Sequence, residues 1–405
     1  MLAPGATVGI IGGGQLGKML AIAAATLGYR THVLCPDPQS PALAVAAEHT
    51  IAPYEDTGAL HHFSQSVDVI TFEFENIAHA PLMALMDNTP VRPHPDILAR
   101  TQHRVQEKDA LQALDVPTAA YAAVTSAETL AEALHTIGTP AVLKTARMGY
   151  DGKGQVKIDQ ASNAATAWQQ MHTSDAILER WITYRMELSV LVARTPSGQC
   201  LCYEPVENRH AHHILASTHV PAPLDASVAE RAIEIATMLA QHWQLEGLMA
   251  IEMFLTHDGQ VLVNEIAPRP HNSGHWTLDA CTTSQFEQAI RAVCDLPLGS
   301  TRRLCPAIME NLIGEDVLRW QEHLHDPHVK LHVYGKDTVR TGRKMGHITR
   351  LLPDEAAAQE AQRNLPVLNA VSPRAVPHAL YQRGTHSPVM MRVTNSCTVG
   401  MRPFA

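Results

Sequence analysis

The sequence lacks the features of membrane-spanning, secreted and nucleic-acid-binding proteins. It contains no apolar run long enough to cross a bilayer, which takes about 20 residues. Residues 1–8 have no basic region followed by an apolar core and a cleavage site, so we expect no secretion. The seven cysteines are scattered and odd in number, which is typical of reduced thiols in the cytoplasm. A net charge of −9 argues against a nucleic-acid partner.

The composition that remains is that of a globular enzyme with more than one domain. Hydrophobic residues make up 45% and charged residues 18% of the chain, a balance that argues against intrinsic disorder. A chain of 405 residues is too long for one ordinary core. We therefore expect two or three domains.

Strands and helices alternate in the first part of the chain. Residues 7–11 predict an apolar strand, followed by a glycine-rich turn, a helix over 18–27 and a strand over 31–35. Such alternation is typical of a parallel sheet with helices on its faces. We predict an α/β, Rossmann-like domain over residues 1–100.

The rest of the chain mixes strands and helices in an α+β pattern. A boundary signal at Val116-Pro117-Thr118 introduces a smaller lobe of about 118–178, which contains a strand over 141–145. We predict one domain over 101–297 with that lobe as a mobile lid, and a small C-terminal domain over 298–370. Residues 371–405 form a tail that we leave unassigned.

Two carboxylates are expected to face each other on a hairpin in the larger domain. Strands over 248–255 and 260–266 flank Asp258-Gly259, and Asp-Gly is a strong signal for a two-residue turn. Residues equidistant from that turn pair, so Glu252 lies opposite Glu265. Like charges in this position are destabilising unless a cation lies between them, and Mg²⁺ or Mn²⁺ suits two carboxylates. The alternative is a solvent-facing hairpin with two hydrated acids.

A first glycine cluster, Gly12-x-Gly14-x-x-Gly17, lies between a strand and a helix, and Asp37 ends the next strand. This pattern is typical of dinucleotide binding, although the glycines would admit any phosphate at a helix N-terminus. A tight turn with close strand–helix packing explains it equally well.

A second glycine cluster indicates a triphosphate site more specifically. It consists of Gly149, Tyr150, Asp151, Gly152, Lys153, Gly154 and Gln155. Three glycines expose backbone amides, and Lys153 with the strand residue Lys144 adds positive charge. Such a loop can close over a nucleotide and expel water. The alternative is a flexible hairpin loop.

Two further groups of charged residues are candidate ligand contacts. Glu73 and Glu75 stand at the carboxyl end of a strand, where open α/β sheets bind ligands. Lys336, Arg343 and Lys344 form a basic cluster suited to a phosphate monoester. An exposed strand end and a solvated basic turn are the respective alternatives.

Taken together, several segments resemble the ATP-grasp superfamily, and most closely the family of N5-carboxyaminoimidazole ribonucleotide synthases. The segments are 72–76, 149–155, 204–210, 264–277 and 342–349, and the resemblance covers roughly residues 7 to 350. It implies an ATP-grasp fold with an N-terminal Rossmann-like (pre-ATP-grasp) domain and a small C-terminal domain. It also implies a cytoplasmic, homodimeric ligase of purine biosynthesis. Such a ligase uses ATP and Mg²⁺ to carboxylate 5-aminoimidazole ribonucleotide with bicarbonate through carboxyphosphate.

The resemblance implies roles for individual residues. ATP phosphates would contact Arg104, Lys144 and the loop 149–155, while Glu179, Arg180, Trp181 and Ile182 would form the hinge that binds adenine. Glu187 would bind the ribose, and His210, Asn264 and Glu265 would lie at the nucleotide. Glu252 and Glu265 would hold the metal.

The same resemblance implies the substrate contacts. Glu73, Glu75, Tyr150, Asp151 and Lys153 would contact the ribonucleotide, with Lys336, Arg343 and Lys344 towards its 5′-phosphate and His271 and Asn272 as further candidates. Arg269 would stabilise the carboxyphosphate anion. Arg269 and Lys153 are the expected catalytic residues.

The chain departs from the superfamily pattern in places. Many ATP-grasp enzymes have a metal-binding asparagine two residues after the second acid, where this chain has Ala267. Asn264 could substitute, but strand alternation predicts that it points to the other face. After His210, His213 stands where glycine is expected.

Three other functions compete with this one. An NAD-dependent oxidoreductase would explain the first glycine cluster but not the paired acids. A sister ATP-grasp enzyme would activate formate for a purine ribonucleotide. A non-catalytic ATP-binding module would rarely need two acids.

Overall fold

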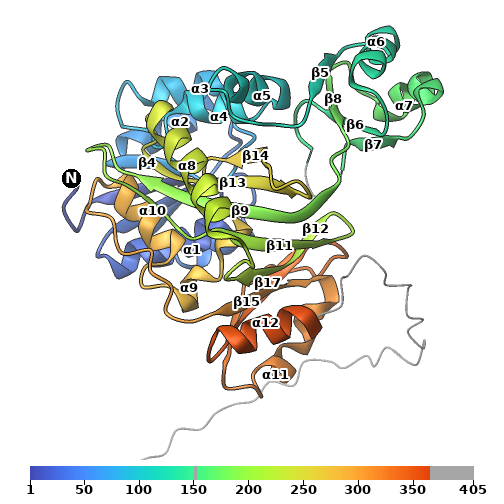
Figure 1. The fold of residues 1–405 in the computed structure, drawn as a ribbon. Helices are drawn as coiled ribbons and strands as arrows, with labels where there is room; N and C mark the ends of the chain where they lie inside the picture. The colour runs from blue at the N-terminus through green and yellow to red at the C-terminus, as the bar shows by residue number, and fades with distance from the viewer. Residues whose placement is uncertain (150–152, 365–405) are drawn as a thin grey trace, which may run out of the picture. The chain divides into compact units, whose positions relative to one another are not determined.

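The computed structural model describes residues 1–149 and 153–364. Its first part is a parallel sheet in the order β3-β2-β1-β4, which confirms the expected alternation of strands and helices (Figure 1). The strands are β1 (Thr7–Ile11), β2 (Arg30–Cys35), β3 (Glu48–Ile51) and β4 (Val69–Phe72). The helices are α1 (Gln15–Thr26), η1 (Pro41–Ala44), α2 (Thr57–Gln65), α3 (His79–Leu85) and α4 (Pro95–Thr101).

Helix α1 begins at Gln15, earlier than the predicted Lys18, and so contains Gly17. Glycine is a poor helix former, so the sequence pattern predicts a helix that begins after Gly17. The structure explains the residue, because a Cβ at Gly17 would lie 2.6 Å from the carbonyl oxygen of Gly12. The close approach of helix and turn requires glycine there.

A small antiparallel sheet follows helix α5 (Arg104–Gln112), in the order β5-β8-β6-β7. Its strands are β5 (Tyr121–Val124), β6 (Ala141–Thr145), β7 (Gln155–Ile158) and β8 (Ala176–Arg180). The helices are α6 (Ala127–Ile137), η2 (Ala161–Asn163) and α7 (Ala164–Met171). Helices α6 and α7 pack against each other and against these strands (Figure 1).

The largest sheet has nine strands in the order β14-β13-β9-β11-β12-β15-β17-β16, with β10 on β9. Its first strands are β9 (Tyr184–Arg194), β10 (Cys200–Cys202), β11 (Val206–Ala211), β12 (Ile214–Val220), β13 (Gly247–Thr256) and β14 (Val261–Ala267). The C-terminal strands are β15 (Ala307–Ile313), β16 (Val329–Val333) and β17 (Lys344–Leu351). The helices are α8 (Ala226–His242), η3 (Asn272–Gly274), α9 (Thr277–Ala280), α10 (Gln285–Val293), η4 (Gly314–Arg319), α11 (Trp320–His323) and α12 (Glu355–Asn364).

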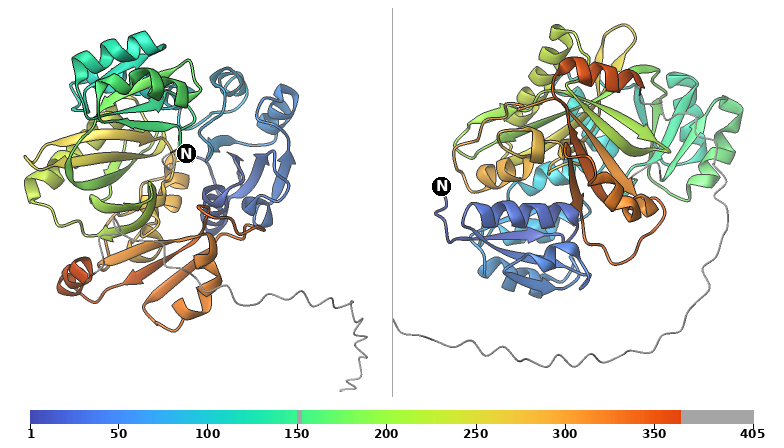
Figure 2. Two further views of the ribbon diagram at one scale, coloured as in Figure 1. Left: turned by 90° about the vertical axis from the view of Figure 1, so that its right-hand side faces the viewer. Right: turned by 90° about the horizontal axis from the view of Figure 1, so that it is seen from below.

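The strands after Pro297 join the same sheet as those before it. Figure 2 shows the orange C-terminal strands beside the green strands, in agreement with the pairing of β12 with β15. The predicted boundary at 297 therefore falls between segments that share one sheet, and the domain limits stay a prediction.

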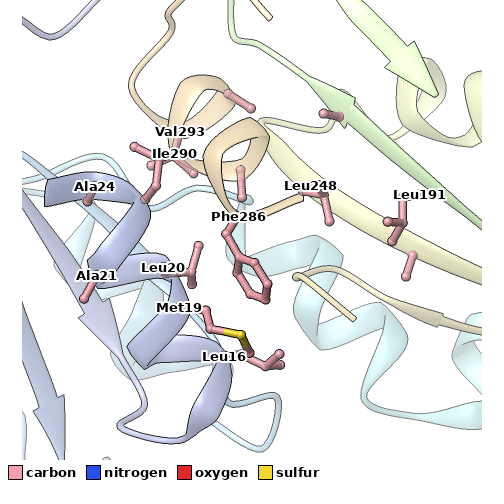
Figure 3. Packing of buried hydrophobic residues seen from close by; sticks show 14 of the residues in the cluster. Leu16, Met19, Leu20, Ala21, Ala24, Leu191, Leu248, Phe286, Ile290 and Val293 are labelled. Carbon is pink, nitrogen blue, oxygen red and sulfur yellow. The ribbon is translucent and has the colours of Figure 1, made fainter. Parts of the chain in front are cut away.

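An apolar contact joins the first sheet to the largest one. Leu16 and Leu20 of α1 lie in one buried cluster with Phe286 and Ile290 of α10 and with Leu248 of β13 (Figure 3). Burial of a phenylalanine of this kind typically contributes about 3 kcal/mol or more to stability. The contact holds the glycine turn before α1 in a fixed position relative to the strands of the largest sheet.

Among the described helices, none is both long and apolar enough to cross a membrane.

Candidate active site

A cleft of about 500 Å³ lies between the small antiparallel sheet and the hairpin β13–β14. Many of the predicted site residues line it. They are Arg104, Lys144, Gly149, Lys153, Gly154, Gln155, Glu179, Arg180, Trp181, Ile182, Glu187, His210, Glu252, Asn264, Glu265, His271, Asn272 and Lys344. Tyr150, Asp151 and Gly152 lie outside the described residues, so their predicted contacts cannot be placed.

The two acids of the hairpin pair as predicted, but the predicted turn is wrong. Glu252 is the direct partner of Glu265. Thr256 donates its amide proton to the Gln260 carbonyl at 2.9 Å, so the loop contains His257, Asp258 and Gly259 rather than two residues. Of these, Gly259 adopts a left-handed φ of 85°, as the αL position of a three-residue loop requires.

A β-bulge restores the predicted pairing. Next to the turn Met253 pairs with Val263, whereas one step further Glu252 pairs with Glu265, so Asn264 is the extra residue. A bulge interrupts the alternation of side chains. Asn264 consequently lines the cleft together with Glu265, and the prediction that it points to the other face is wrong.

The paired carboxyl groups differ in charge because their neighbours differ. Burial and the charge of Glu265 raise the pKa of Glu252 to about 8. Burial also favours the neutral form of Glu265, but Arg104 and Lys144 outweigh it and lower the pKa of that group. Arg104 Nη1 lies 3.0 Å from Glu265 Oε2, whereas Glu252 Oε1 lies 3.3 Å from His271 Nε2. Burial lowers the pKa of His271 well below its usual value, so this neighbour is neutral.

The donor set fits a divalent ion shared with phosphate oxygens. Within residues 1–149 and 153–364, no three or more His, Cys, Asp or Glu side chains are grouped to hold a metal by themselves. Glu252 and Glu265 provide two hard oxygen donors, and Mg²⁺ commonly takes one or two carboxylates plus substrate phosphates. A cation between them would also remove the repulsion that raises the pKa of Glu252.

Arg104 and Lys144 line the other wall of the cleft, and Lys108 lies behind them. Lys144 on β6 binds the carboxylate of Glu179 on β8, and Lys108 Nζ lies 3.7 Å from the second oxygen of that carboxylate. Burial favours the neutral form of Glu179, but Lys144 and Lys108 lower the pKa of that carboxyl to about 2. Arg104 also donates to the Gly149 carbonyl at 3.1 Å, which ties the glycine loop to α5.

Glu187 and His210 form a second charged pair in the cleft. His210 Nδ1 binds Glu187 Oε2, and Tyr184 donates its hydroxyl proton to Glu187 Oε1 at 2.6 Å. Burial lowers the pKa of His210, but Glu187 outweighs it and raises that pKa. The ring of Tyr184 stacks on Phe254 at 4.7 Å between centroids, which holds Glu187 at the rim of the cleft.

The first glycine cluster holds a side chain of this protein. The Gly14 amide donates to Glu73 Oε1 at 2.7 Å, and a Cβ at Gly12 would lie 2.6 Å from Glu73 Cγ. Burial raises the pKa of Glu73, against the lowering effects of the Gly14 amide, Arg269 and Lys336. The N-terminus of α1 therefore binds the carboxyl group of Glu73. In the dinucleotide interpretation a phosphate would bind there.

Of the remaining predicted substrate residues, Arg269 and Lys336 lie near Glu73, and their charges lower the pKa of its carboxyl group. Arg269 Nη2 lies 2.9 Å from Glu75 Oε2, and Glu75 Oε1 is buried without a hydrogen-bond partner among residues 1–149 and 153–364. Lys336 donates to the Lys344 carbonyl at 2.7 Å, which links this region to the cleft. Arg343 donates to the Thr338 carbonyl at 3.2 Å on the exposed turn.

Family models match three successive parts of the chain. They are the ribonucleotide synthetase preATP-grasp domain over 5–102, the ATP-grasp domain over 109–286 and the phosphoribosylaminoimidazole carboxylase C-terminal domain over 307–361. The N5-carboxyaminoimidazole ribonucleotide synthase of Bacillus subtilis is 44% identical over 362 residues, which cover 88% of this chain and 94% of that protein. The chain belongs to the N5-carboxyaminoimidazole ribonucleotide synthase family.

Solved structures of family members agree with this assignment. The ADP complex of an N5-carboxyaminoimidazole ribonucleotide synthetase matches with a TM-score of 0.87 and 41% identity, covering 91% of this chain and 98% of that one. The enzyme of Aspergillus clavatus in complex with ADP and 5-aminoimidazole ribonucleotide matches with a TM-score of 0.83 and 28% identity, covering 90% and 99%. A bifunctional purine synthesis protein of Dictyostelium discoideum is 44% identical, but the matched segment spans 37% of its length.

Membership of the synthase family confirms the predicted fold and reaction class. The chain has an ATP-grasp domain between a pre-ATP-grasp domain and a family-specific C-terminal domain, and it is an ATP-using ligase. The formate-activating and NAD-dependent alternatives are not favoured.

Glu107 and Lys108 of this synthase family member belong to no motif from which the sequence predicts a site residue. Both are buried, and both contact the backbone of β14. They follow Arg104 by three and four residues on a predicted helix, so they share its face. Their spacing from Arg104 is the one sequence feature that indicates a place near the site.

Proposed function

We propose that this chain uses ATP to carboxylate the amine of 5-aminoimidazole ribonucleotide with bicarbonate. The products are N5-carboxyaminoimidazole ribonucleotide, ADP and phosphate. The observation that carries the proposal is the pair Glu252–Glu265 in one cleft with Arg104 and Lys144. Two carboxylates that can hold a metal ion and two cationic side chains that can bind phosphate oxygens suit a nucleoside triphosphate with its metal.

Glu252 and Glu265 would hold Mg²⁺, or Mn²⁺, together with Asn264 beside them. When bound, the ion would neutralise charge on the phosphate oxygens. Arg104, Lys144 and Lys153 would bind those oxygens by charge-assisted hydrogen bonds, and the segment Glu179–Ile182 would bind the base. Glu187, held by Tyr184 and His210, would accept hydrogen bonds from the ribose.

The aminoimidazole ribonucleotide would lie between the cleft and the glycine turn before α1. Glu75 Oε1 is a buried acceptor to which no described residue donates a hydrogen bond, so it is suited to orient the amine. Arg269 lies beside Glu75, and its guanidinium would stabilise the anion of the carboxyl donor. Lys336 and Arg343 would bind the 5′-phosphate.

One assay tests this proposal. ADP formation is measured with and without 5-aminoimidazole ribonucleotide, each with and without bicarbonate. We expect full turnover when both are present. Turnover that needs formate and ignores bicarbonate would refute the carboxylation and support the sister activity.

We also infer that the protein works as a homodimer in the cytoplasm. The family resemblance supports the dimer, and the use of ATP supports the compartment. Sedimentation velocity should give a mass roughly twice the 44.2 kDa of the chain. A mass equal to that of one chain at micromolar concentration would refute the dimer.

A further inference from the structure

The register of the hairpin β13–β14 decides whether the two acids meet. If the pairing next to the turn continued unchanged, Glu252 would face Asn264, and Glu265 would face Ile251. A shift of one residue in a strand reverses which face each side chain points to. The bulge at Asn264 is therefore what brings Glu265 opposite Glu252.

Strand β14 is the edge of the nine-stranded sheet, so its outer backbone groups need partners. Around the bulge these partners come from α5 and from the segment that follows it. Lys108 Nζ donates to the Val263 carbonyl at 3.1 Å and to the Asn264 carbonyl at 2.7 Å. The Val263 amide donates to the Pro117 carbonyl at 2.8 Å, and the Ile266 amide donates to Glu107 Oε2 at 3.3 Å.

Lys108 is an unusual choice for a structural contact. Its side chain is 2% exposed, and burial lowers the pKa of its ammonium group, although Glu179 and Glu107 oppose this. Burying a charged group without full compensation destabilises the folded state. Two carbonyls of the bulge and the carboxylate of Glu179 compensate it here. The same ammonium group thus contacts β14 on one side and, through Glu179, Lys144 on the other.

We propose that Lys108 is a positioning residue, which holds the bulge of β14 so that Glu265 and Asn264 face the nucleotide cleft beside Glu252. The inference rests on the metal role proposed for that pair. Lys108 is not among the described residues that line the cleft. It therefore acts through the backbone of Val263 and Asn264 and, by way of the bulge, on the position of Glu265.

A residue that merely fills space would affect every property of the site alike. A residue that sets the hairpin register affects the metal site selectively. Without Lys108 the two bulge carbonyls lose their donor, and the strand relaxes towards regular pairing, in which Asn264 faces Glu252. Binding of the nucleotide base and ribose does not involve this register.

The experiment compares ADP binding with and without Mg²⁺ by titration calorimetry. The variants are Lys108→Met, which keeps the volume and removes the charge, and the control Lys330→Met on the exposed part of β16. In the natural chain and in K330M, Mg²⁺ should strengthen ADP binding. In K108M we expect that strengthening to fall at least about tenfold, as with residues that orient metal ligands. The affinity for ADP alone should stay within about threefold, since Lys108 lies outside the cleft lining and Glu179 keeps its ion pair with Lys144 in the variant.

Each other outcome counts against a specific statement. Equal losses with and without Mg²⁺ would make Lys108 a structural residue and overturn the inference, as would an unchanged K108M. If K108M does not fold, Lys108→Gln, which keeps a donor, is measured in the same way. Failure of both variants to fold beside a folded K330M would also overturn it. A natural chain that binds ADP equally well with and without Mg²⁺ would refute the proposed metal role instead.

Discussion

At the scale of single residues, Glu252 and Glu265 have the same side chain and different protonation. Burial and Glu265 raise the pKa of Glu252 to about 8, whereas Arg104 and Lys144 lower that of Glu265 against the effect of burial. Near neutral pH the metal-free site therefore carries one proton on Glu252. If the pair holds a divalent ion as proposed, that ion would displace the proton of Glu252, while Glu265 is already ionised.

The substitution Glu265→Gln tests the metal role. It removes the ionised donor and leaves Arg104 without its partner, so ADP formation should fall at least about 100-fold, as when a positioned charge is removed from an active site. Calorimetric unfolding should show that the fold persists. The control Glu132→Gln, on the exposed face of α6, should keep full activity. Near-normal phosphate release by E265Q would show that the acid holds no metal.

Lys336 is the residue that tests where the ribonucleotide lies. Its charge acts on Glu73, and its ammonium group donates to the Lys344 carbonyl. Lys336→Ala should raise the KM for the ribonucleotide about tenfold, the loss expected for one charged hydrogen bond, and should change the KM for ATP far less. Steady-state kinetics with each substrate varied would measure both, with Lys330→Ala as the control. Equal increases in the KM for the ribonucleotide and the KM for ATP would show that Lys336 does not bind the 5′-phosphate.

At the scale of elements, local patterns predicted the strands well. They also predicted the correct pairing of the two acids in the hairpin, but from a turn of the wrong length. Strand β6 was predicted over 141–145 and is found there, because its apolar run is buried. The sequence signal Asp258-Gly259 gave the pairing of Glu252 with Glu265 through a turn that is one residue too short. The bulge that corrects the difference depends on Lys108, which belongs to another element, and no local pattern contains that information.

The junction of β1 and α1 provides a prediction about stability. Gly17→Ala places a Cβ 2.6 Å from the backbone oxygen of Gly12, so the helix must move away from the turn. Overpacking of this kind costs about 1–3 kcal/mol, more than the gain in helix propensity. The matched control Gly58→Ala lies exposed in α2, with its nearest contact at 3.4 Å, and should be neutral or stabilising by up to about 1 kcal/mol. Urea unfolding measures both variants, and a G17A protein as stable as G58A would contradict the tight contact.

At the scale of the whole molecule, the family and the fold class were predictable from the sequence. That the strands after Pro297 join the same sheet as those before it was not predictable. Glycine loops, paired acids and the lysine strand lie in short segments, so sequence alone could indicate the ATP-grasp fold. The pairing of β12 with β15 joins residues about 90 positions apart, and such pairing depends on three-dimensional packing rather than on local pattern. Local pattern also gave no sign of a stack of three histidine rings. The ring of His347 on β17 stacks on His275, directly after η3, at 4.6 Å and on His332 of β16 at 4.5 Å.

Buried histidines make the stability of the whole molecule depend on acid pH. Burial lowers the pKa of His219 to about 3 and the pKa values of His275 and His347 well below the usual value. A lowered folded pKa means that the unfolded chain binds more protons once the pH falls below about 6.5, so acid favours unfolding. Each such histidine should remove about 1.4 kcal/mol of stability between neutral pH and pH 5.5.

His219→Gln isolates one of these contributions. His219 lies on β12, is fully buried and shares a hydrogen bond of 2.9 Å with the Ser217 hydroxyl. Glutamine cannot titrate, so the loss of unfolding free energy between pH 7.5 and 5.5 should be about 1.4 kcal/mol smaller than in the natural chain. Carboxyl groups with raised pKa values, such as Glu107 and Glu252, oppose the acid effect in both proteins, so they cancel in this difference. Urea unfolding at the two pH values supplies the measurement, with the exposed His135→Gln as a control whose pH dependence should match the natural chain. Equal pH dependence of H219Q and the natural chain would mean that His219 accepts a proton in the folded state as easily as in the unfolded one, against its burial between β11 and β15.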